Sequence, residues 1–288
     1  MDGTSGNEAE SDTGWERIRY DEPAERVARI TLARPEAANA QDYLMLSELN
    51  QAFDRAAQDP GVRCIVLAAD GKHFSSGHDL RDRTDICHLP TVGTQANFEA
   101  PGAEGYMARE AEMYVGLCWR WRNIAKPTIA SVQGKVIAGG LMLVWPMDLV
   151  VCSEDATFSD PVVAFGVNGI EYFVHPYEVG ARLAKEMLFT GRAITAQEAL
   201  QHGMVSKVVP RDELESATLE MASRIASRPM FGLTLAKQSV NHTLDAMGMY
   251  TALQSAFGLH HVAHNHNARL FDGSMVDPSG AEVIRREA

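Results

Sequence analysis

The sequence is short of several features that would point to particular classes of protein. It has four cysteines in 288 residues, and they are far apart, without a CxxC pair and without histidines at metal-ligand spacing. Buried free thiols in a reducing compartment are therefore expected, rather than disulfides or a zinc site. The longest apolar stretch, residues 136–151, is interrupted by Pro146 and Asp148, so it is too short to span a bilayer.

Positive charge is also scarce. The chain has 26 lysines and arginines against 38 aspartates and glutamates, which gives a formal net charge of -12. This excess of acid argues against nucleic acid and anionic membranes as main partners. A polyanionic small molecule remains compatible with it, because a few local cations and backbone amides can hold such a ligand. Residues 1–14 have no apolar core and no basic run, so we expect neither a secretory signal nor a transit peptide there and predict a cytoplasmic protein.

The most informative stretch that is present has glycines at its centre. Residues 129–132 are predicted to form a buried strand, and Gly139 and Gly140 to begin a helix that runs to about Pro146. The unpaired N–H groups at a helix start point outward with the positive end of the helix dipole. They can hold an oxygen that is becoming an anion, which is one half of an oxyanion hole. The loop at residues 74–80, after an apolar strand, is a good candidate for the other half.

The pattern of apolar residues predicts three parts: a disordered tail at residues 1–14, an α/β core at residues 15–209 and a helical region at residues 210–288. In the core and the helical region, the expected strands are 15–20, 27–32, 63–68, 129–132, 149–152 and 162–165, and the expected helices are 42–57, 106–122, 212–227 and 233–258. A turn is predicted around residues 21–23. Residues 81–104 have no clear period and are predicted to be either a mobile cover over a site or a segment that is partly ordered only with ligand.

Two segments together, KHFSSGHDL and QGKVIAGGLMLVWPMDLVV, resemble the paired oxyanion-loop motifs of the crotonase (enoyl-CoA hydratase/isomerase) superfamily. Further matches follow in the family's order, namely ARPEAANA, FSDPVVAFGV and LFTGRAITAQEALQHGMVSKVVP, and together they cover roughly residues 16–240. The resemblance implies a crotonase-like spiral of ββα units with a C-terminal helical region that assembles trimers or dimers of trimers. It also implies an acyl-CoA thioester as the partner, with coenzyme A as part of the substrate and no separate cofactor.

The resemblance assigns roles to several residues. The backbone N–H groups of His78 and Gly139 would stabilise the enolate oxygen of the thioester, and the loss of one such donor typically raises the barrier by ~3 kcal/mol. The remaining residues implied to contact the substrate are Ala38, Asn39, Ala40, Ser76, Asp79 and Leu80. A tight turn at residues 75–77, with Asp79 capping a following helix, is the structural alternative for the first loop.

The acid and base groups of a hydratase are missing. In hydratases of this family two glutamates hold the water, and the matching positions here are Met142 and Val162, which would line the substrate site. Neither side chain can transfer a proton. The resemblance therefore implies double-bond isomerisation rather than hydration, or else an acyl-CoA-binding protein that has lost the chemistry; a scaffold without any ligand is a weaker third interpretation.

Glu171 is the candidate replacement base. It lies nine residues beyond Val162, where some family members that move double bonds carry an acidic group. Its apolar neighbours would raise the pKa of the carboxyl group, which suits a group that shuttles one proton. His175 would meet Glu171 if the segment were helical. The structural alternative is a Glu171 that forms an ion pair with Arg182 or caps the helix before Pro176.

Other polar residues carry weaker expectations. Asp160 is predicted to be a helix cap or a turn residue, and only the backbone of His78 is implied to act. His260, His261, His264 and His266 lack supporting carboxylate or cysteine spacing, so we predict an exposed polar helix end and assign no metal ligand. The sequence leaves open which residues hold the phosphates of coenzyme A; the candidates are Arg34, Arg81, Arg83 or a neighbouring subunit.

Overall fold

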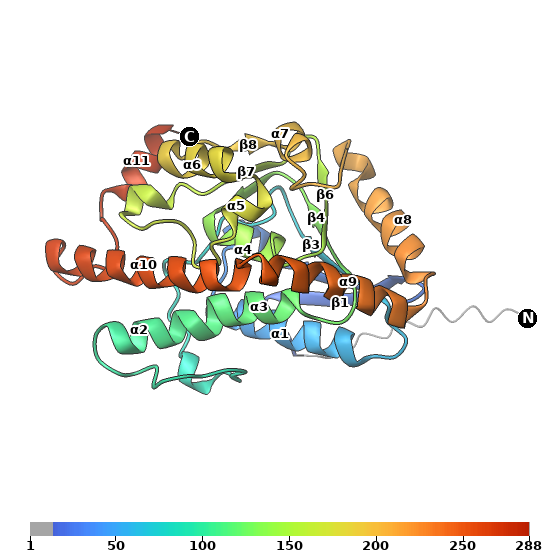
Figure 1. The fold of residues 1–288 in the computed structure, drawn as a ribbon, viewed down its shortest axis with the longest axis horizontal. Coiled ribbons are helices and arrows are strands. Elements are labelled where there is room, and N and C mark those ends of the chain that lie inside the picture. Colours follow the sequence, from blue (N-terminus) through green and yellow to red (C-terminus); the bar gives the residue numbers. More distant parts are fainter. Residues whose placement is uncertain (1–13, 288) are drawn as a thin grey trace, which may run out of the picture.

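The computed structural model of the chain describes residues 14–287 and builds them into two sheets (Figure 1). The larger sheet has the strand order β1-β2-β3-β4-β6-β9, and the smaller has the order β5-β7-β8. The strands are β1 (Ile18–Ala24), β2 (Val27–Leu32), β3 (Cys64–Ala69), β4 (Thr128–Val132), β5 (Lys135–Ile137), β6 (Leu149–Ser153), β7 (Thr157–Ser159), β8 (Ile194–Thr195) and β9 (Lys207–Val209).

The helices lie between and around these strands. They are α1 (Tyr43–Gln58), α2 (Ala103–Glu110), α3 (Leu117–Arg122), α4 (Leu141–Val144), α5 (His175–Glu178), α6 (Ala181–Thr190), α7 (Ala196–Gln201), α8 (Leu214–Ala226), α9 (Met230–Ala246), α10 (Met249–Leu270) and α11 (Gly280–Glu287). A π-helix at Ala111–Gly116 joins α2 to α3, and short 3₁₀ helices lie at Pro35–Ala37, Ile86–His88, Ala138–Gly140, Val162–Phe165 and Arg211–Glu213.

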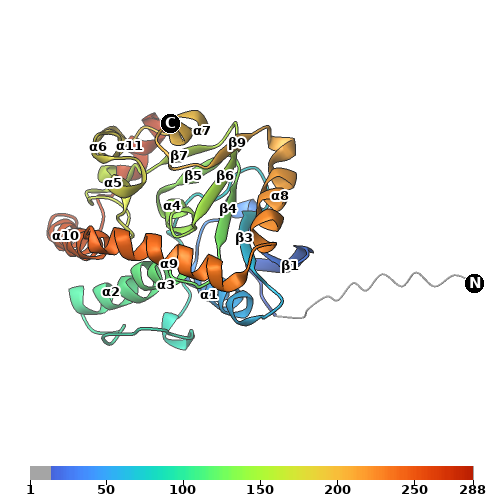
Figure 2. The same ribbon diagram turned by 45° about the vertical axis from the view of Figure 1, so that its right-hand side comes forward.

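The larger sheet is buried on both faces. Only β1 and β2 pair in the antiparallel direction; from β2 to β9 each neighbouring pair is parallel. Along β3, Cys64 and Val66 pack with α8, while Ile65 and Leu67 join the main core on the other face. This two-sided burial explains why the parallel strands read as continuous apolar runs. Figure 2 shows α8 on one side of the sheet and α4 on the other.

Helix α10 crosses the molecule between α2 and the smaller helices α5 and α6, as both views show (Figures 1 and 2). It follows α9 after a break at Met247 and Gly248, where Gly248 adopts a φ of 95°. The predicted single helix at 233–258 was therefore wrong in two respects, because it is two helices and because α10 continues to Leu270. A residue with positive φ ends one helix before the next begins.

Several other predictions are corrected. The turn predicted at residues 21–23 lies instead at residues 25–26, where Arg26 has a φ of 63°, and β1 continues to Ala24. The strand predicted at 162–165 is a 3₁₀ helix, because apolar runs this short do not distinguish the two structures. The single helix predicted at 106–122 contains the π-helix, and β5 was not predicted.

Other expectations hold for the most part. Cys64, Cys118 and Cys152 are buried free thiols as expected, whereas Cys87 is a free thiol that is exposed, contrary to the expectation of burial. Asp42 caps α1 by accepting the N–H of Met45, at the predicted helix start. Most of the tail predicted at residues 1–14 lies outside the described residues. Within residues 14–287, no helix is both long enough and apolar enough to cross a membrane.

Candidate active site

The two predicted oxyanion loops lie against each other, and glycine makes this contact sterically feasible. A Cβ atom on Gly77, whose φ is 93°, would lie 2.8 Å from Ile137 O and 3.2 Å from the Gly139 nitrogen. A Cβ on Gly139 would lie 2.8 to 3.0 Å from three atoms of the His78 ring. Real Cβ atoms do not approach so closely, so both positions need glycine. The structure thus brings residues 78 and 139 together, which the account of a shared oxyanion hole requires.

Gln41, which the sequence analysis missed, ties the two loops to a third. Its buried side-chain amide donates to Gly139 O at 2.8 Å and to Ser75 Oγ at 3.3 Å. Ser75 Oγ in turn donates to Asn39 O and accepts the Gly77 N–H. The hydrogen bond to the carbonyl of Gly139 fixes the plane of the peptide between Gly139 and Gly140. Gln41 therefore sets the direction of backbone groups in the second loop.

These loops line a cavity of about 630 Å³. His78, Ala138, Val162 and Glu171 contribute to its wall, together with the side of α10 that faces α2. A partly apolar cavity of this size with a few convergent polar groups is the usual form of a small-molecule site. Among the residues predicted to contact a substrate, Ser76, Asp79, Leu80 and Val162 line it. Gly139 does not itself line the cavity but adjoins Ala138, which does.

Met142 is the clearest mismatch with the predicted set. It lies in α4 with 1% of its surface exposed, packs within the main hydrophobic core and does not line the cavity. Val162 begins the 3₁₀ helix Val162–Phe165 and faces the cavity. The two positions therefore offer the cavity one apolar side chain and no acid or base group.

Within the described part of the chain, Glu171 is one of two buried carboxylates that line the cavity, the other being Glu110. Its Oε2 lies 3.2 Å from His78 Nε2, and its Oε1 lies 3.5 Å from His260 Nε2. Neither alternative, an ion pair with Arg182 or a helix cap, is found, and His175 is not its partner. The side chain of His78, for which only a backbone role was implied, stacks on Tyr114 with ring centroids 4.2 Å apart.

The pKa of Glu171 moves opposite to expectation, and that of His78 is shifted by the same contact. Burial alone would raise the pKa of Glu171, but the adjacent His78 outweighs it, so that the pKa of the carboxyl group is lowered. For His78, burial would lower the pKa, and the Glu171 carboxylate outweighs this and raises it. The predicted raised pKa of Glu171 was therefore wrong, because the sequence could not show a histidine 93 positions away as its neighbour.

Asp160 and His175 form a separate buried pair. The His175 Nε2 lies 2.8 Å from Asp160 Oδ2, which also accepts the N–H of Ile170, and both side chains are fully buried. The prediction of a cap or turn role for Asp160 was thus wrong. By accepting the Ile170 N–H, Asp160 holds the backbone directly before Glu171, so the pair fixes the segment that carries the candidate base.

Three of the four histidines predicted to lie at an exposed helix end are instead buried. His260, His261 and His264 are buried on the face of α10 that meets α2, where Nε2 of His261 lies 3.1 Å from a carboxylate oxygen of Glu110. Only His266 is exposed. Glu110 itself is 4% exposed and could not be linked to these histidines from sequence, since 150 positions separate it from His260.

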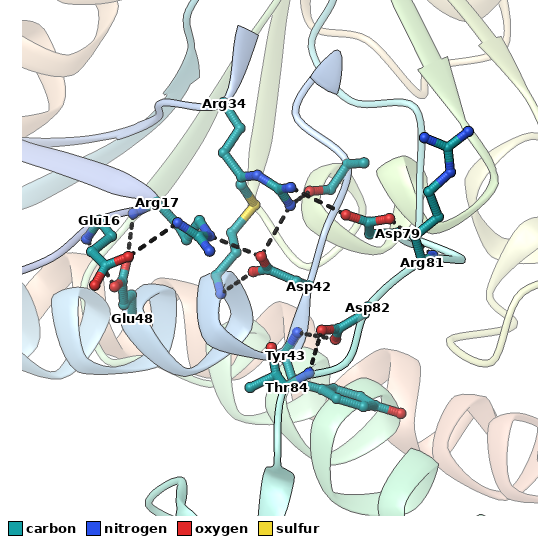
Figure 3. Close-up of polar contacts among 12 residues, drawn as sticks. Glu16, Arg17, Arg34, Asp42, Tyr43, Glu48, Asp79, Arg81, Asp82 and Thr84 are labelled. Atoms are coloured by element: carbon teal, nitrogen blue, oxygen red, sulfur yellow. Dashed lines mark hydrogen bonds and ion pairs between the residues drawn. The ribbon is translucent and has the colours of Figure 1, made fainter. Parts of the chain in front are cut away.

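Beside the cavity, which Asp79 and Asp82 line, polar contacts arrange the loops that the resemblance assigns to coenzyme A (Figure 3). The guanidinium of Arg34 lies 3.1 Å from both Asp42 and Asp79 and donates to Ala40 O. Its charge is therefore already paired. Arg81 and Arg83 are exposed near the same edge, and Arg83 lines the cavity. No helix follows Asp79, whose carboxylate accepts the N–H of Arg81 in a turn.

The loop at residues 38–40 uses much of its polar surface internally. The Asn39 side chain is fully buried, accepts the Arg34 N–H and donates to Asp70 O and His73 O. The carbonyl oxygen of Ala38 accepts the Ser76 N–H. Asn39 and Ala38 both have a positive φ, of 51° and 49°. The loop is thus held in a strained and defined shape beside the first oxyanion loop.

Comparison with known proteins places this geometry in a family. A sequence profile described as enoyl-CoA hydratase/isomerase matches residues 22–273. The chain belongs to the enoyl-CoA hydratase/isomerase family. It is 44% identical over 269 residues to EchA13 of Mycobacterium tuberculosis, with 91% of this chain and 85% of that protein covered.

Solved structures agree with the match to the enoyl-CoA hydratase/isomerase family. An enoyl-CoA hydratase/isomerase from Xanthobacter autotrophicus is 33% identical with a TM-score of 0.78, and 94% of each chain is covered. A Mycobacterium smegmatis protein is 48% identical with a TM-score of 0.82, covering 90% of this chain and 98% of that one. The predicted crotonase fold is therefore confirmed, and the family acts on acyl-CoA thioesters.

Proposed function

We propose that the chain is an enoyl-CoA isomerase that moves a double bond along an acyl-CoA thioester, with Glu171 as its proton-transfer group. The observation that carries the proposal is the place of Glu171: a buried carboxylate on the wall of the cavity, in contact with a residue of the first oxyanion loop. An isomerase needs one group to remove and return a proton, whereas the hydratase positions hold Met142 and Val162.

The reaction follows from the positions of these groups. The backbone N–H groups of His78 and Gly139 would hold the thioester oxygen, so that removal of a C2 proton from a 3-enoyl-CoA leaves an enolate whose charge rests on that oxygen. The Glu171 carboxylate takes the proton. Return of the same proton to C4 shifts the double bond from C3–C4 to C2–C3 and restores the carboxylate. The substrate gains and loses one proton, and no water is added.

Two assays test the proposal. Incubation with a 3-enoyl-CoA should produce the conjugated 2-enoyl-CoA, followed by its absorbance, and incubation with crotonyl-CoA should give little hydration. Glu171→Gln should abolish the isomerisation, since the amide cannot accept the proton, with a loss of about 10³-fold or more. Glu178→Gln is the matched control, because Glu178 is another carboxylate near the core that does not line the cavity. Efficient crotonyl-CoA hydration would contradict the proposal.

A non-catalytic acyl-CoA-binding protein is the second candidate, and the apolar residues at positions 142 and 162 favour it. It predicts that butanoyl-CoA and 3-enoyl-CoA bind while neither enoyl substrate is converted. Saturable binding without turnover would therefore replace the isomerase proposal. Turnover that survives in Glu171→Gln would leave the family assignment in place but remove Glu171 as the proton-transfer group.

A further inference from the structure

The face of α10 that meets α2 carries a cluster of ligand-type side chains that the proposed isomerisation does not use. Glu110 ends α2, and His260, His261 and His264 lie on α10. These four side chains are between 3% and 6% exposed. One carboxylate oxygen of Glu110 and one ring nitrogen each of His260 and His264 lie within 4.8 Å of one another.

Two backbone carbonyls determine which ring nitrogens face the cluster. Nδ1 of His260 lies 3.0 Å from Gly169 O, and Nδ1 of His264 lies 2.7 Å from Met275 O. Because a carbonyl oxygen only accepts hydrogen bonds, each Nδ1 carries the hydrogen. In the neutral ring, Nε2 then presents a lone pair toward Glu110. Metal-ligating histidines are held in the same way, by an N–H donated to a carbonyl or carboxylate on the far side of the ring.

The inward-facing atoms are close to one another but not well hydrogen-bonded. Nε2 of His260, Nε2 of His264 and Oε2 of Glu110 are buried, and within residues 14–287 none of them makes a hydrogen bond of good geometry, although Oε2 of Glu110 lies 3.1 Å from Nε2 of His261. A lone pair that faces a carboxylate is repelled unless positive charge lies between them. The carboxylate of Glu171 is also close, 3.5 Å from His260 Nε2. A divalent cation would neutralise the charges of Glu110 and Glu171 while leaving the imidazoles neutral.

We propose that Glu110, His260 and His264 bind one divalent first-row transition ion of the Zn²⁺ class. Histidines four residues apart on a helix present their nitrogens on one face, and a carboxylate from a second helix completes a set of three ligands. The ligand atoms of tetrahedral zinc lie about 3.3 Å apart, and His264 Nε2 is 3.4 Å from Glu110 Oε1. The pair already has the spacing of two zinc ligands, and a ring nitrogen of His260 lies within 4.8 Å of a ligand atom of each residue of the pair, so a small movement of that ring would complete the set.

The fourth ligand position would open into the cavity, because all three ligands line it. A site with three protein ligands and one open position is the catalytic rather than the structural form of a zinc site. The ion would hold a water molecule there and lower the pKa of that water. The cation site does not rest on the proposed isomerisation, since it uses other residues and is tested without a substrate.

The test measures metal content on the full chain, produced without a histidine tag. The protein is stripped with a chelator, incubated with Zn²⁺, freed of unbound ion and analysed by mass spectrometry for zinc per chain. The expected result is one ion per chain, with binding weakened 100-fold or more in His260→Ala and in His264→Ala. His266→Ala is the control, since His266 is on the same helix but exposed, and it should bind as the wild type does. Mg²⁺, which prefers oxygen ligands, should not compete.

Two results would overturn the proposal: no retained zinc in the wild-type chain, or retention that the two variants leave unchanged. If the variants fail to fold, the visible absorption spectrum of Co²⁺ bound to the wild-type chain tests the site instead. Intense visible absorption of tetrahedral Co²⁺ with nitrogen ligands supports the site, while the weak spectrum of the aqueous ion rules it out. Isomerisation is measured separately on the metal-free and the zinc-loaded protein. A failure of the isomerase proposal can therefore be told from a failure of the zinc-site proposal.

Discussion

At the residue scale, close contacts between backbone and side chains position the candidate chemistry. Gly139 lets the His78 ring lie directly over its Cα, and that ring contacts the carboxylate of Glu171. Gln41 holds the carbonyl of Gly139 in a fixed direction. These contacts link a backbone loop, an imidazole and a carboxylate, so small changes at any of them should alter activity more than stability.

Gly139→Ala tests this linkage. The added methyl group would lie within 3.0 Å of the His78 ring, so the ring must move and lose its place between Glu171 and Tyr114. We expect a loss of about 10²-fold in kcat/KM, the scale of a disturbed oxyanion donor, with the free energy of unfolding lowered by only about 1 kcal/mol. Steady-state kinetics and urea denaturation measure the two effects.

Gly232→Ala provides the control for that variant. A Cβ at this position in α9 would meet no atom within 4 Å, so we expect unchanged kinetics and a gain in stability of about 0.5 to 1 kcal/mol, because alanine favours the helix. Equal kinetic losses in both variants would contradict the role of Gly139.

Much of the residue-scale picture could be predicted, but not the partners. Gly139, His78 and Glu171 could be selected as site candidates because they lie in short motifs whose order along the chain is informative, and their roles stay predictions. His175 was expected to meet Glu171 only if the segment between them were helical; α5 begins at His175, and the partner of His175 is Asp160. Contacts such as Gln41 with Gly139, 98 residues apart, depend on how sheets bring loops together, and no local pattern encodes them.

Glu178 gives a prediction about pH. Loss of water around its carboxyl group raises the pKa to about 8, above the ordinary value near 4.3 that it has in the unfolded chain. The folded state therefore holds a proton that the unfolded state has lost, so this contribution to stability is full below about pH 4 and declines as the pH rises to about 8. Glu178→Gln should remove that decline and stabilise the chain at pH 8 by up to about 5 kcal/mol. Denaturant midpoints at pH 5, 6.5 and 8 measure it, and parallel curves for the two proteins would contradict it.

At the scale of elements, the candidate site lies where helices from distant parts of the chain meet. The π-helix Ala111–Gly116 joins α2 to α3 and carries Tyr114, which stacks on His78. π-turns inside helices are rare and often occur at functional sites. Sequence periodicity predicts a continuous helix here, since one inserted residue changes the apolar pattern too little to be seen. Likewise α10 brings its histidines to Glu110 only because α9 and α10 are separated at Gly248.

Lys237 tests how α9 is attached to the sheet. It is 9% exposed, its ammonium lies 2.8 Å from Asp148, and it donates to Lys126 O. Lys237→Ala would leave Asp148 with the Thr128 N–H and hydroxyl as donors, and because Asp148 is exposed to solvent, we expect a loss of about 1 to 2 kcal/mol in stability. Lys185→Ala, at an exposed position in α6, should change stability by no more than about 0.5 kcal/mol. Equal thermal midpoints for the two variants would contradict the attachment.

At the scale of the whole molecule, the C-terminal helices leave apolar side chains in contact with solvent. Phe231, Val240, Leu259 and Val262 on α9 and α10 are each more than half exposed. Exposed apolar side chains on neighbouring helices are typical of an interface, so we expect one on this face. The family fold and its helical C-terminal region could be predicted because several motifs recur in a known order. How subunits would pack against one another could not be predicted from the sequence, since it depends on shape complementarity between surfaces.

The predicted assembly is a homotrimer or a dimer of trimers. Sedimentation velocity should give three or six chains per particle, and Val262→Asp should shift the chain toward monomer by placing a charge in the interface. Val92→Asp, at an exposed apolar residue of the loop before α2, should leave the assembly unchanged. A monomeric wild-type chain at micromolar concentration would contradict the prediction.

The most direct test of the central claim is the exchange of C2 protons of butanoyl-CoA in D₂O, followed by NMR. A saturated acyl-CoA has no double bond to move, so exchange reports only the removal of a proton beside a stabilised thioester oxygen. The account predicts exchange catalysed by the wild-type chain and by Glu178→Gln, and exchange at the uncatalysed rate with Glu171→Gln. Undiminished exchange with Glu171→Gln, or no exchange by a wild-type chain that binds butanoyl-CoA, would contradict it.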